Sequence, residues 1–151
     1  MSNVSYNIRK ATKSDFLFIL KLILGVGINP VGLDWRRFLV AVSENGGNIG
    51  CAQIKIHKDG ARELASVAVV PDYRHLGVAH GLIRMILENQ ESPIYLTCRE
   101  SLVSFYERFG FYEMVDLDSM PAYFRKVKRV FTWLEKRKWV EPLAVMVWNG
   151  E

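Results

Sequence analysis

Hydrophobic positions follow two different spacings along this chain. Short apolar runs such as 38–43 and 62–70 have the length of buried strands, whereas Phe16, Ile19 and Ile23 recur at the spacing of one helix face. The runs predict strands at residues 6–11, 38–43, 48–57, 62–70, 93–98, 111–115 and 143–148. The helical spacings predict helices over residues 12–25, 77–90 and 97–110, and a fourth that begins at Pro121 and carries apolar positions to Leu134.

Turn-forming residues separate these elements. Asn45-Gly46 and Asp59-Gly60 supply the positive φ angles of tight hairpin turns. Residues 25–32 are dense in glycine and proline and predict an irregular loop. The hairpins join three consecutive strands, so the second to fourth strands should pair antiparallel.

The third helix has a start signal of its own. Thr97 and Glu100 have the spacing of a capping box, which predicts that the helix opens at Thr97. Its inward positions are predicted to be Leu102, Phe105 and Phe109, with Gly110 as its C-terminal stop.

The order of these elements predicts the fold class. Strands and helices mix in an α/β (α+β) arrangement, around a mostly antiparallel mixed sheet of about seven strands with helices against it. One strand, helix, strand crossover lies in the middle of the chain, between the runs 62–70 and 93–98. With 151 residues, half of them hydrophobic, we expect a single domain over residues 1–151.

Composition excludes several classes of protein. The first residues lack the apolar region of a secretory signal, and no apolar run approaches the roughly 18 residues of a membrane span, so we expect a soluble cytoplasmic protein. Cys51 and Cys98 lie in apolar runs and are predicted to be buried free thiols. His57, His75 and His80 have no metal-ligand spacing, so no metal is predicted.

The net charge of +4 is concentrated in one segment. Residues 123–139 carry seven Lys or Arg and one Glu, or +6, which leaves 4 − 6 = −2 for the rest of the chain. Lysines and arginines interleaved with Phe131, Trp133 and Trp139 could bind nucleic acid. The apolar positions of the segment keep the spacing of a packed helix, however, so we expect a helix with a charged outer face and no nucleic-acid partner.

The chemistry of the chain points to residues 73–81, "YRHLGVAHG", where a strand ends and a helix begins. Unpaired backbone N–H groups at a helix start attract anions, and Gly77 and Ala79 lack the bulk that would keep a pyrophosphate away. The spacing is neither a Walker motif nor a dinucleotide fingerprint. The alternative is an ordinary strand, turn and helix whose glycine serves packing.

Two longer stretches carry a family resemblance. "ELASVAVVPDYRHLGVAHGLI" followed by "PIYLTCRESLVSFYERFGF" resembles the GNAT superfamily of acetyl-CoA-dependent N-acetyltransferases. The resemblance covers roughly residues 6–115. It is strongest in the V-x-P-x-[YF]-R-x-x-G-x-[GA] and F-Y-E-R-x-G-F elements, which stand at the separation typical of that family.

The resemblance implies a site for acetyl-CoA. The sheet would splay after its fourth strand, with the pantetheine arm along that strand and the pyrophosphate on the following amides. The cofactor-binding residues it implies are Val67, Ala68, Val69, Arg74, His75, Leu76, Gly77, Val78, Ala79 and Tyr106. Such a protein would transfer an acetyl group to a primary amine by direct attack in a ternary complex.

Two residues are candidates for the proton transfers. Tyr106 matches the tyrosine that points at the CoA sulfur in the family, and a phenol with a pKa near roughly 10 can protonate a thiolate. The alternative is a ring that packs beside Leu102. Glu63 lies at the start of the fourth strand, and alternation along the strand predicts that its side chain shares a face with Val67. Many members of the family keep a carboxylate base at this place. The alternative is a solvated surface residue.

The acceptor side of the site is less specific. Arg99 stands about where many members carry an asparagine that contacts CoA, which puts that contact in doubt. The pocket candidates by position are Asn29, Trp35, Tyr112 and Tyr123. Residues 116–123 resemble the end of the acetyltransferase domain of N-acetylglutamate synthases, which suggests a small amino-acid-like amine. Arylalkylamines and polyamines are the other classes of small acceptor that we consider.

Two further hypotheses remain open. The domain could bind acetyl-CoA without transferring it, as a sensor or structural subunit. A homodimer is possible, because the final apolar strand, residues 143–148, could exchange between subunits.

Overall fold

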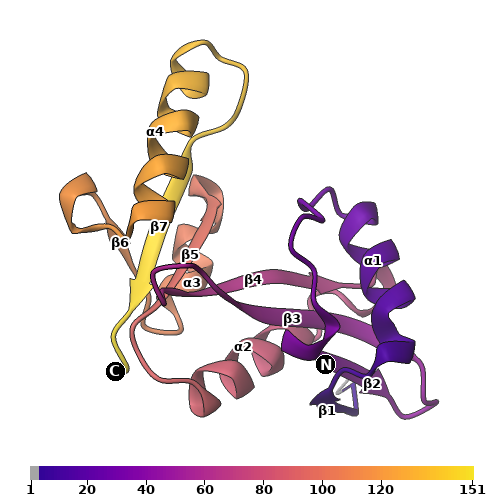
Figure 1. Cartoon of the computed structure of the whole chain (residues 1–151). Helices are drawn as coiled ribbons and strands as arrows, with labels where there is room; N and C mark the ends of the chain where they lie inside the picture. Colours follow the sequence, from indigo (N-terminus) through magenta and orange to yellow (C-terminus); the bar gives the residue numbers. More distant parts are fainter. Residues whose placement is uncertain (1–3) are drawn as a thin grey trace. The chain divides into compact units, whose positions relative to one another are not determined.

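The computed structural model describes residues 4–151 and confirms the predicted order of elements (Figure 1). The strands are β1 (Tyr6–Lys10), β2 (Phe38–Ser43), β3 (Asn48–Ile56), β4 (Arg62–Val69), β5 (Ile94–Arg99), β6 (Tyr112–Met114) and β7 (Leu143–Trp148). The α-helices are α1 (Phe16–Gly25), α2 (Val78–Asn89), α3 (Val103–Glu107) and α4 (Ala122–Lys136). Short 3-10 turns η1 (Lys13–Asp15), η2 (Trp35–Arg37), η3 (Pro71–Tyr73), η4 (Glu100–Leu102) and η5 (Leu117–Ser119) join them.

The strands form one mixed sheet in the order β1-β2-β3-β4-β5-β7-β6. The pairs β1–β2, β2–β3, β5–β7 and β6–β7 are antiparallel, and β4–β5 is parallel. This confirms the predicted seven-stranded, mostly antiparallel sheet with one crossover. The parallel register joins Arg62 to Ile94 and Glu63 to Tyr95, at the start of both strands.

The described chain divides into two compact units. The first takes the residues up to Lys55 and Leu64–Gln90, and the second takes Ile56–Glu63 and Glu91–Glu151. The turn between β3 and β4 therefore groups with the C-terminal elements. The single domain expected over residues 1–151 stays a prediction.

In the first unit, α1 and α2 cover opposite faces of the strands (Figure 1). The core on the α1 side contains Ala11, Ile19, Leu22, Ile23, Phe38, Val40, Cys51 and Ala68. On the other face α2 approaches β3 at Gly50, where a Cβ atom would lie 3.2 Å from Cγ1 of Val78. A glycine at this position allows the helix to pack closely on the strand.

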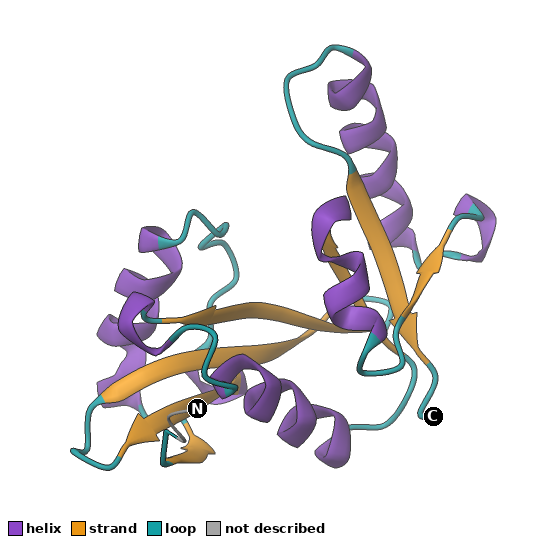
Figure 2. Cartoon of the chain, turned by 180° about the vertical axis from the view of Figure 1, so that it is seen from behind, coloured by secondary structure: helices purple, strands orange, loops and turns teal. Residues whose placement is uncertain are grey.

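In the second unit, β7 lies between β5 and β6, and α4 runs beside β7 (Figure 2). Met120, Phe124 and Val145 form the buried cluster beneath α4. Lys128 donates a hydrogen bond from Nζ to the carbonyl of Leu143. Both edges of β7 are thus paired within the chain, and the homodimer stays a prediction.

Two details of the third helix differ from the prediction. Thr97 does not cap a helix, because β5 continues to Arg99 and Thr97 pairs with Val145 of β7. Ladder pairing satisfies the backbone groups that a cap would have needed. Leu102 is exposed, whereas Phe109 is buried as predicted. The helix ends at Glu107, and the predicted stop Gly110, with φ 95°, lies in the turn that follows.

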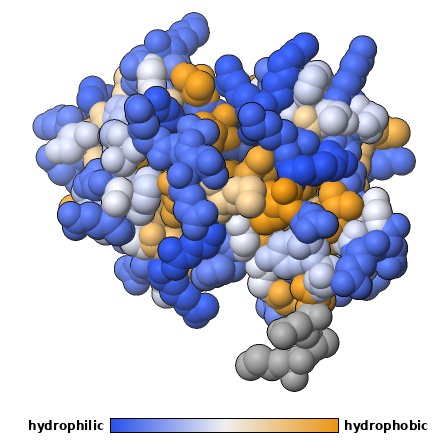
Figure 3. Space-filling model, turned by 90° about the horizontal axis from the view of Figure 1, so that it is seen from below, coloured by the Kyte–Doolittle hydropathy of each residue, from blue (hydrophilic) through white to orange (hydrophobic). Residues whose placement is uncertain are grey.

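Both cysteines are buried and free, as predicted. Burial raises the pKa of the Cys51 thiol to about 12 and that of Cys98 to about 11. Hydrophilic residues cover much of the face in Figure 3, with hydrophobic ones gathered in smaller groups between them. Within residues 4–151, no helix has the length and apolar character needed to cross a membrane.

Candidate active site

The predicted anion site lies at the start of α2, in the first unit. Two residues just before the helix have left-handed backbone angles, His75 with φ 63° and Gly77 with φ 87°. Successive N–H groups in such a backbone converge into a concave, anion-binding nest. A Cβ atom built on Gly77 would meet nothing within 4 Å, so the space in front of the nest is open.

The amides differ in their availability to a ligand. Arg74 N–H donates to the carbonyl of Pro71 at 3.3 Å, so this amide is already engaged. Val78 and Ala79 lie in the first turn of a 12-residue helix, where N–H groups have no intrahelical acceptor. Their N–H dipoles and the positive end of the helix favour a phosphate at this position.

Tyr6, which the sequence analysis missed, positions this turn. Its hydroxyl donates to the carbonyl of Gly77 at 3.0 Å, from a strand 71 residues away. A side chain at Gly81 would collide with that hydroxyl. The glycine in the second half of "YRHLGVAHG" therefore makes room for a tyrosine, and nothing local in the sequence indicates this partner.

The last residues of β4 offer backbone groups for a pantetheine arm. Val70 N–H donates to Ile49 of β3 at 2.9 Å, and alternation along a strand turns the peptide groups of Val69 toward the opposite edge. The carbonyl of Val69 accepts Nε of Arg74 at 3.0 Å. Arg74 therefore ties the end of the strand to the anion nest.

Ser66 interrupts β4 one residue before Val67. Its φ of 56° breaks the extended geometry, so the shared face predicted for Glu63 and Val67 does not follow from alternation. Nε2 of buried Gln53 donates to the Ser66 hydroxyl at 2.8 Å and holds the irregularity in place. The side chain of Ala68 packs in the α1 core, so any part of this residue in cofactor binding stays a prediction that concerns its backbone groups.

Glu63, the predicted base, lies in the second unit and is buried rather than solvated. Only 4% of the residue is exposed, and its Oε1 lies 3.1 Å from Nε2 of His57. The hairpin after β3 brings the two together, because His57 N–H donates to the carbonyl of Ala61. The sequence analysis considered His57 only in excluding a metal site, although its position in the hairpin could have indicated the pair.

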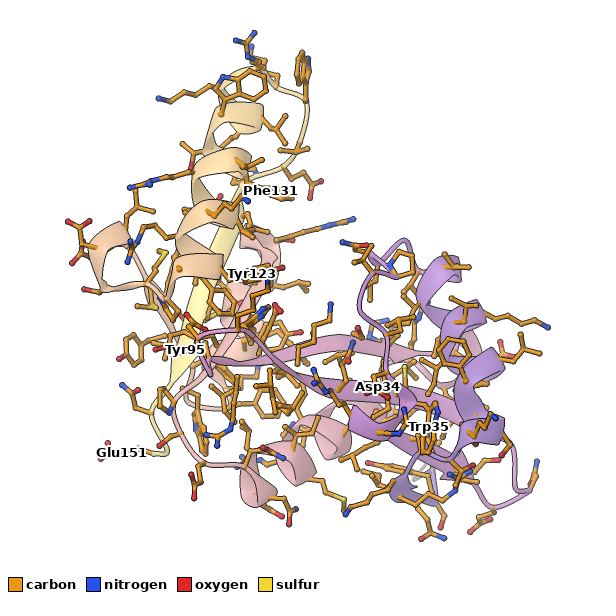
Figure 4. The ribbon with its side chains drawn as sticks, in the orientation of Figure 1. Asp34, Trp35, Tyr95, Tyr123, Phe131 and Glu151 are labelled. Carbon is orange, nitrogen blue, oxygen red and sulfur yellow. The ribbon has the colours of Figure 1, made fainter. Side chains whose placement is uncertain are left out.

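Aromatic rings surround this pair. Tyr123 stacks on the His57 imidazole with ring centroids 3.9 Å apart and planes 20° apart. Phe124 meets the imidazole edge-on with ring centroids 5.5 Å apart, and its ring is tilted by 30° against that of Tyr95 at 5.2 Å. Figure 4 labels Tyr95 and Tyr123. Burial and the nearby Glu63 charge raise the pKa of the Tyr123 phenol.

Tyr106, the predicted acid, is half-buried on α3 of the second unit. Its ring meets Phe105 and Phe111 edge-on at 5.0 and 6.0 Å, rather than the exposed Leu102. Burial, with a smaller contribution from Cys98, raises the pKa of its phenol to about 12. The ordinary pKa assumed from the sequence is therefore wrong, and the hydroxyl stays protonated throughout the neutral range.

Each of the other acceptor candidates has local contacts of its own. Asn29 caps its own turn, with Oδ1 accepting from Val31 N–H at 3.0 Å. Trp35 packs against the α1 core under the guanidinium of Arg36, and Tyr112 is 51% exposed. Of the four candidates, Tyr123 has the contacts of a site residue.

Arg99 is a surface residue at the end of β5. Its Nε lies 3.6 Å from Glu141 Oε2, and both side chains are about 70% exposed. Among residues 4–151, no group of three or more His, Cys, Asp or Glu side chains is arranged to hold a metal ion.

Comparison with known proteins identifies the family. A family model described as the acetyltransferase (GNAT) domain matches residues 34–113, more than half of the chain. The chain belongs to the GNAT family of acetyltransferases.

Solved structures share its fold at low sequence identity. The N-acetylglutamate synthase of Neisseria gonorrhoeae, solved with coenzyme A and N-acetyl-glutamate, is 19% identical with a TM-score of 0.72. This alignment covers 97% of the present chain and 35% of the synthase. The GNAT protein thus spans about a third of the length of that enzyme.

Two relatives of similar length have the same fold. Rv2747 from Mycobacterium tuberculosis, solved with CoA and NLQ, is 19% identical with a TM-score of 0.72, over 94% of this chain and 98% of that one. A GNAT-family acetyltransferase from Staphylococcus aureus Mu50 is 16% identical with a TM-score of 0.69. This alignment covers 97% of the present chain and 100% of the Staphylococcus chain. Among curated proteins, none matches this sequence.

Proposed function

We propose that this GNAT protein transfers an acetyl group from acetyl-CoA to the primary amine of a small, amino-acid-like molecule. The observation that carries the proposal is the open nest of amides at Gly77, which suits a pyrophosphate. The solved relatives that were crystallised with coenzyme A support the choice of donor. The bound N-acetyl-glutamate of the Neisseria enzyme supports the class of acceptor.

The donor would bind through backbone groups of the first unit. Its pyrophosphate would accept hydrogen bonds from the amides between His75 and Ala79, helped by the helix dipole. Its pantetheine amides would pair with Val67 and Val69 in the manner of an added strand. Leu76 and Val78 would contribute their amides rather than their side chains, because the Val78 side chain is 1% exposed.

The reaction needs a neutral amine, a polarised carbonyl and a stabilised leaving thiolate. The nitrogen lone pair attacks the carbonyl carbon of the thioester, the C–S bond then breaks, and its electron pair leaves with sulfur. Backbone N–H groups near Val67 and Val69 are our candidates for polarising the carbonyl. Glu63 is our candidate for the acceptor's proton, and its carboxylate also attracts a cationic amine.

Tyr106 would act on the departing thiolate. A phenol with a pKa of about 12 is a weak acid, so complete transfer to a free thiolate of pKa about 8.5 is uphill by roughly 5 kcal/mol. We therefore assign it the role of hydrogen-bond donor to sulfur as the C–S bond breaks, with proton transfer completed from water.

Calorimetry tests the donor site directly. Wild-type protein titrated with acetyl-CoA should bind with a micromolar Kd, and Gly77→Glu should abolish binding by placing charge and bulk in the nest. Gly46→Glu is the matched control, because Gly46 has a similar φ of 83° and open space around it but lies in the β2–β3 turn. Equal loss in both variants, or no binding by folded wild type, would contradict the proposal.

A transfer assay separates an enzyme from a sensor. With acetyl-CoA and L-glutamate, L-arginine, phenethylamine or spermidine as probes, release of free thiol together with an acetylated amine supports transfer. Tight acetyl-CoA binding with no acetylation of a broad amine panel would instead favour the sensor hypothesis.

A further inference from the structure

We infer that His57, oriented by Glu63, takes the proton from the acceptor amine. This inference rests on the proposed function and changes the part that Glu63 plays in it. His57 becomes the catalytic residue and Glu63 a positioning residue. The observations that carry it are the order of exposure, the hydrogen bond between the two side chains and the rings that hold the imidazole.

The His57 imidazole is more exposed to solvent than the Glu63 carboxylate. The side chain of Glu63 is 6% exposed and that of His57 is 17% exposed. A cationic amine that approaches from solvent therefore reaches the imidazole first. Glu63 also has its oxygen Oε1 engaged by the ring at 3.1 Å.

The hydrogen bond selects one tautomer of His57. An ionised carboxylate can only accept, so Nε2 carries the hydrogen and Nδ1 keeps a lone pair. Within the described part of the chain, Nδ1 has no hydrogen-bond partner. The carboxylate thus leaves a basic nitrogen on the more exposed of the two side chains, as a carboxylate does for histidines in other proton-transfer sites.

Packing fixes the ring in this orientation. Tyr123 covers one face at a centroid distance of 3.9 Å, and Phe124 abuts the ring at an angle of 80°. Both come from the first turn of α4, which is itself anchored by the fully buried Phe124. A base held by packing keeps its geometry without reorganisation during the reaction.

The proton passes from the acceptor amine to Nδ1 of His57. Nδ1 forms a bond to a proton of the amine, the N–H bond breaks, and its electron pair stays on the amine nitrogen, which attacks the acetyl carbon. The resulting imidazolium is stabilised by the Glu63 carboxylate. Tyr123 from α4 is the titratable group stacked on the ring, while Tyr95 from β5 lies against Phe124, where the charge of Asp59 acts on its phenol. Water finally takes the proton from His57.

The test compares His57→Gln with Glu63→Gln in acetyl transfer to the best of the four probe amines, from pH 5 to pH 9. His57→Gln should lower kcat about 100-fold or more and remove the acidic limb of the pH profile. Glu63→Gln should lower kcat less and move that limb. The exposed neighbour Lys58→Gln should keep the wild-type profile. Near wild-type rates for His57→Gln with inactive Glu63→Gln would overturn the inference.

Two readouts separate this inference from the proposed function. Both variants should keep wild-type acetyl-CoA affinity by calorimetry, which also reports correct folding. ¹⁵N NMR of the imidazole, which needs no acceptor, should show the Nε2–H tautomer at neutral pH in wild type and a mixture in Glu63→Gln. An Nδ1–H tautomer in the wild type would overturn the inference even if no probe amine is acetylated.

Discussion

At the scale of single residues, surroundings change the chemistry that residue type suggests. Tyr106 has the identity expected of a general acid, but desolvation raises the pKa of its phenol to about 12. Glu63 has the identity of an exposed strand residue, but the hairpin buries it against His57. In both cases a motif could predict the residue, whereas its surroundings follow from long-range packing.

Tyr106→Phe should lower kcat about 10- to 100-fold and leave the Kd of acetyl-CoA unchanged, because only a hydrogen bond to the leaving sulfur is removed. Steady-state rates with a saturating amine and calorimetry measure the two quantities. Tyr112→Phe is the control, since Tyr112 is 51% exposed and its hydroxyl accepts a hydrogen bond from Nδ2 of Asn149. Unchanged turnover in Tyr106→Phe would remove the assignment.

Gly110→Ala should lower the free energy of unfolding by about 1 to 2 kcal/mol, because φ at this position is 95° and a side chain would meet the carbonyl of Glu151. Gly47→Ala is the matched control, because its nearest contact would be an ordinary 3.7 Å to Ser43 Oγ. Urea denaturation measures both. Equal stability of the two variants would show that the turn after α3 can relax.

At the scale of elements, buried polar contacts join strands and helices that the hydrophobic spacing predicts only one by one. Asp15 accepts hydrogen bonds from Arg9 of β1 at 2.7 Å and from Asn48 of β3 at 3.0 Å. It also accepts from Thr12 N–H at 2.7 Å, which closes the turn before α1. One carboxylate therefore fixes the entry of α1 against two strands.

Asp15 should make stability depend on pH in the acidic range. Its hydrogen bonds, above all with Arg9, hold the pKa of its carboxyl well below the ordinary value of about 3.9. The stabilisation is therefore complete above pH 4 and is lost as pH falls below the unfolded pKa toward the lower folded one. Asp15→Asn should lower the free energy of unfolding by about 3 kcal/mol near pH 7. It should also reduce the fall of this free energy as the pH becomes acidic.

Urea titrations of wild type and Asp15→Asn between pH 2 and pH 7 provide the measurement. The two proteins should differ most near neutrality and converge in acid. A constant difference at every pH would mean that the charge of Asp15 contributes nothing and that only its shape matters. Asp118→Asn, at an exposed position in η5, is the control.

At the scale of the whole molecule, the uneven charge does not define a nucleic-acid site. The basic segment 123–139 begins with a helix whose Phe124 is fully buried, and Lys128 is engaged by the Leu143 carbonyl. Exposed Trp133 and Trp139 lie 4.2 and 5.6 Å from the guanidinium of Arg137. These contacts are those of a packed helix whose outer residues interact with one another.

Fluorescence anisotropy with a labelled 20-nucleotide single strand should therefore show no micromolar association at 150 mM salt. Weak binding at low salt would reflect only the net charge of +4. Lys126→Glu combined with Arg129→Glu gives the charge control. Strong, steeply salt-dependent binding that this double variant abolishes would restore the nucleic-acid hypothesis.

The sequence by itself determined the order of elements, the pairing class of the sheet and the strand-to-helix junction at residues 73–81. These depend on spacings of two to four residues and on glycine and proline, which act locally. Tertiary structure decided which side chains meet: Tyr6 at Gly77, Gln53 at Ser66, and His57 with Glu63 beneath Tyr123. Such pairs depend on strand register and helix packing across distant segments, which no local spacing in the sequence encodes.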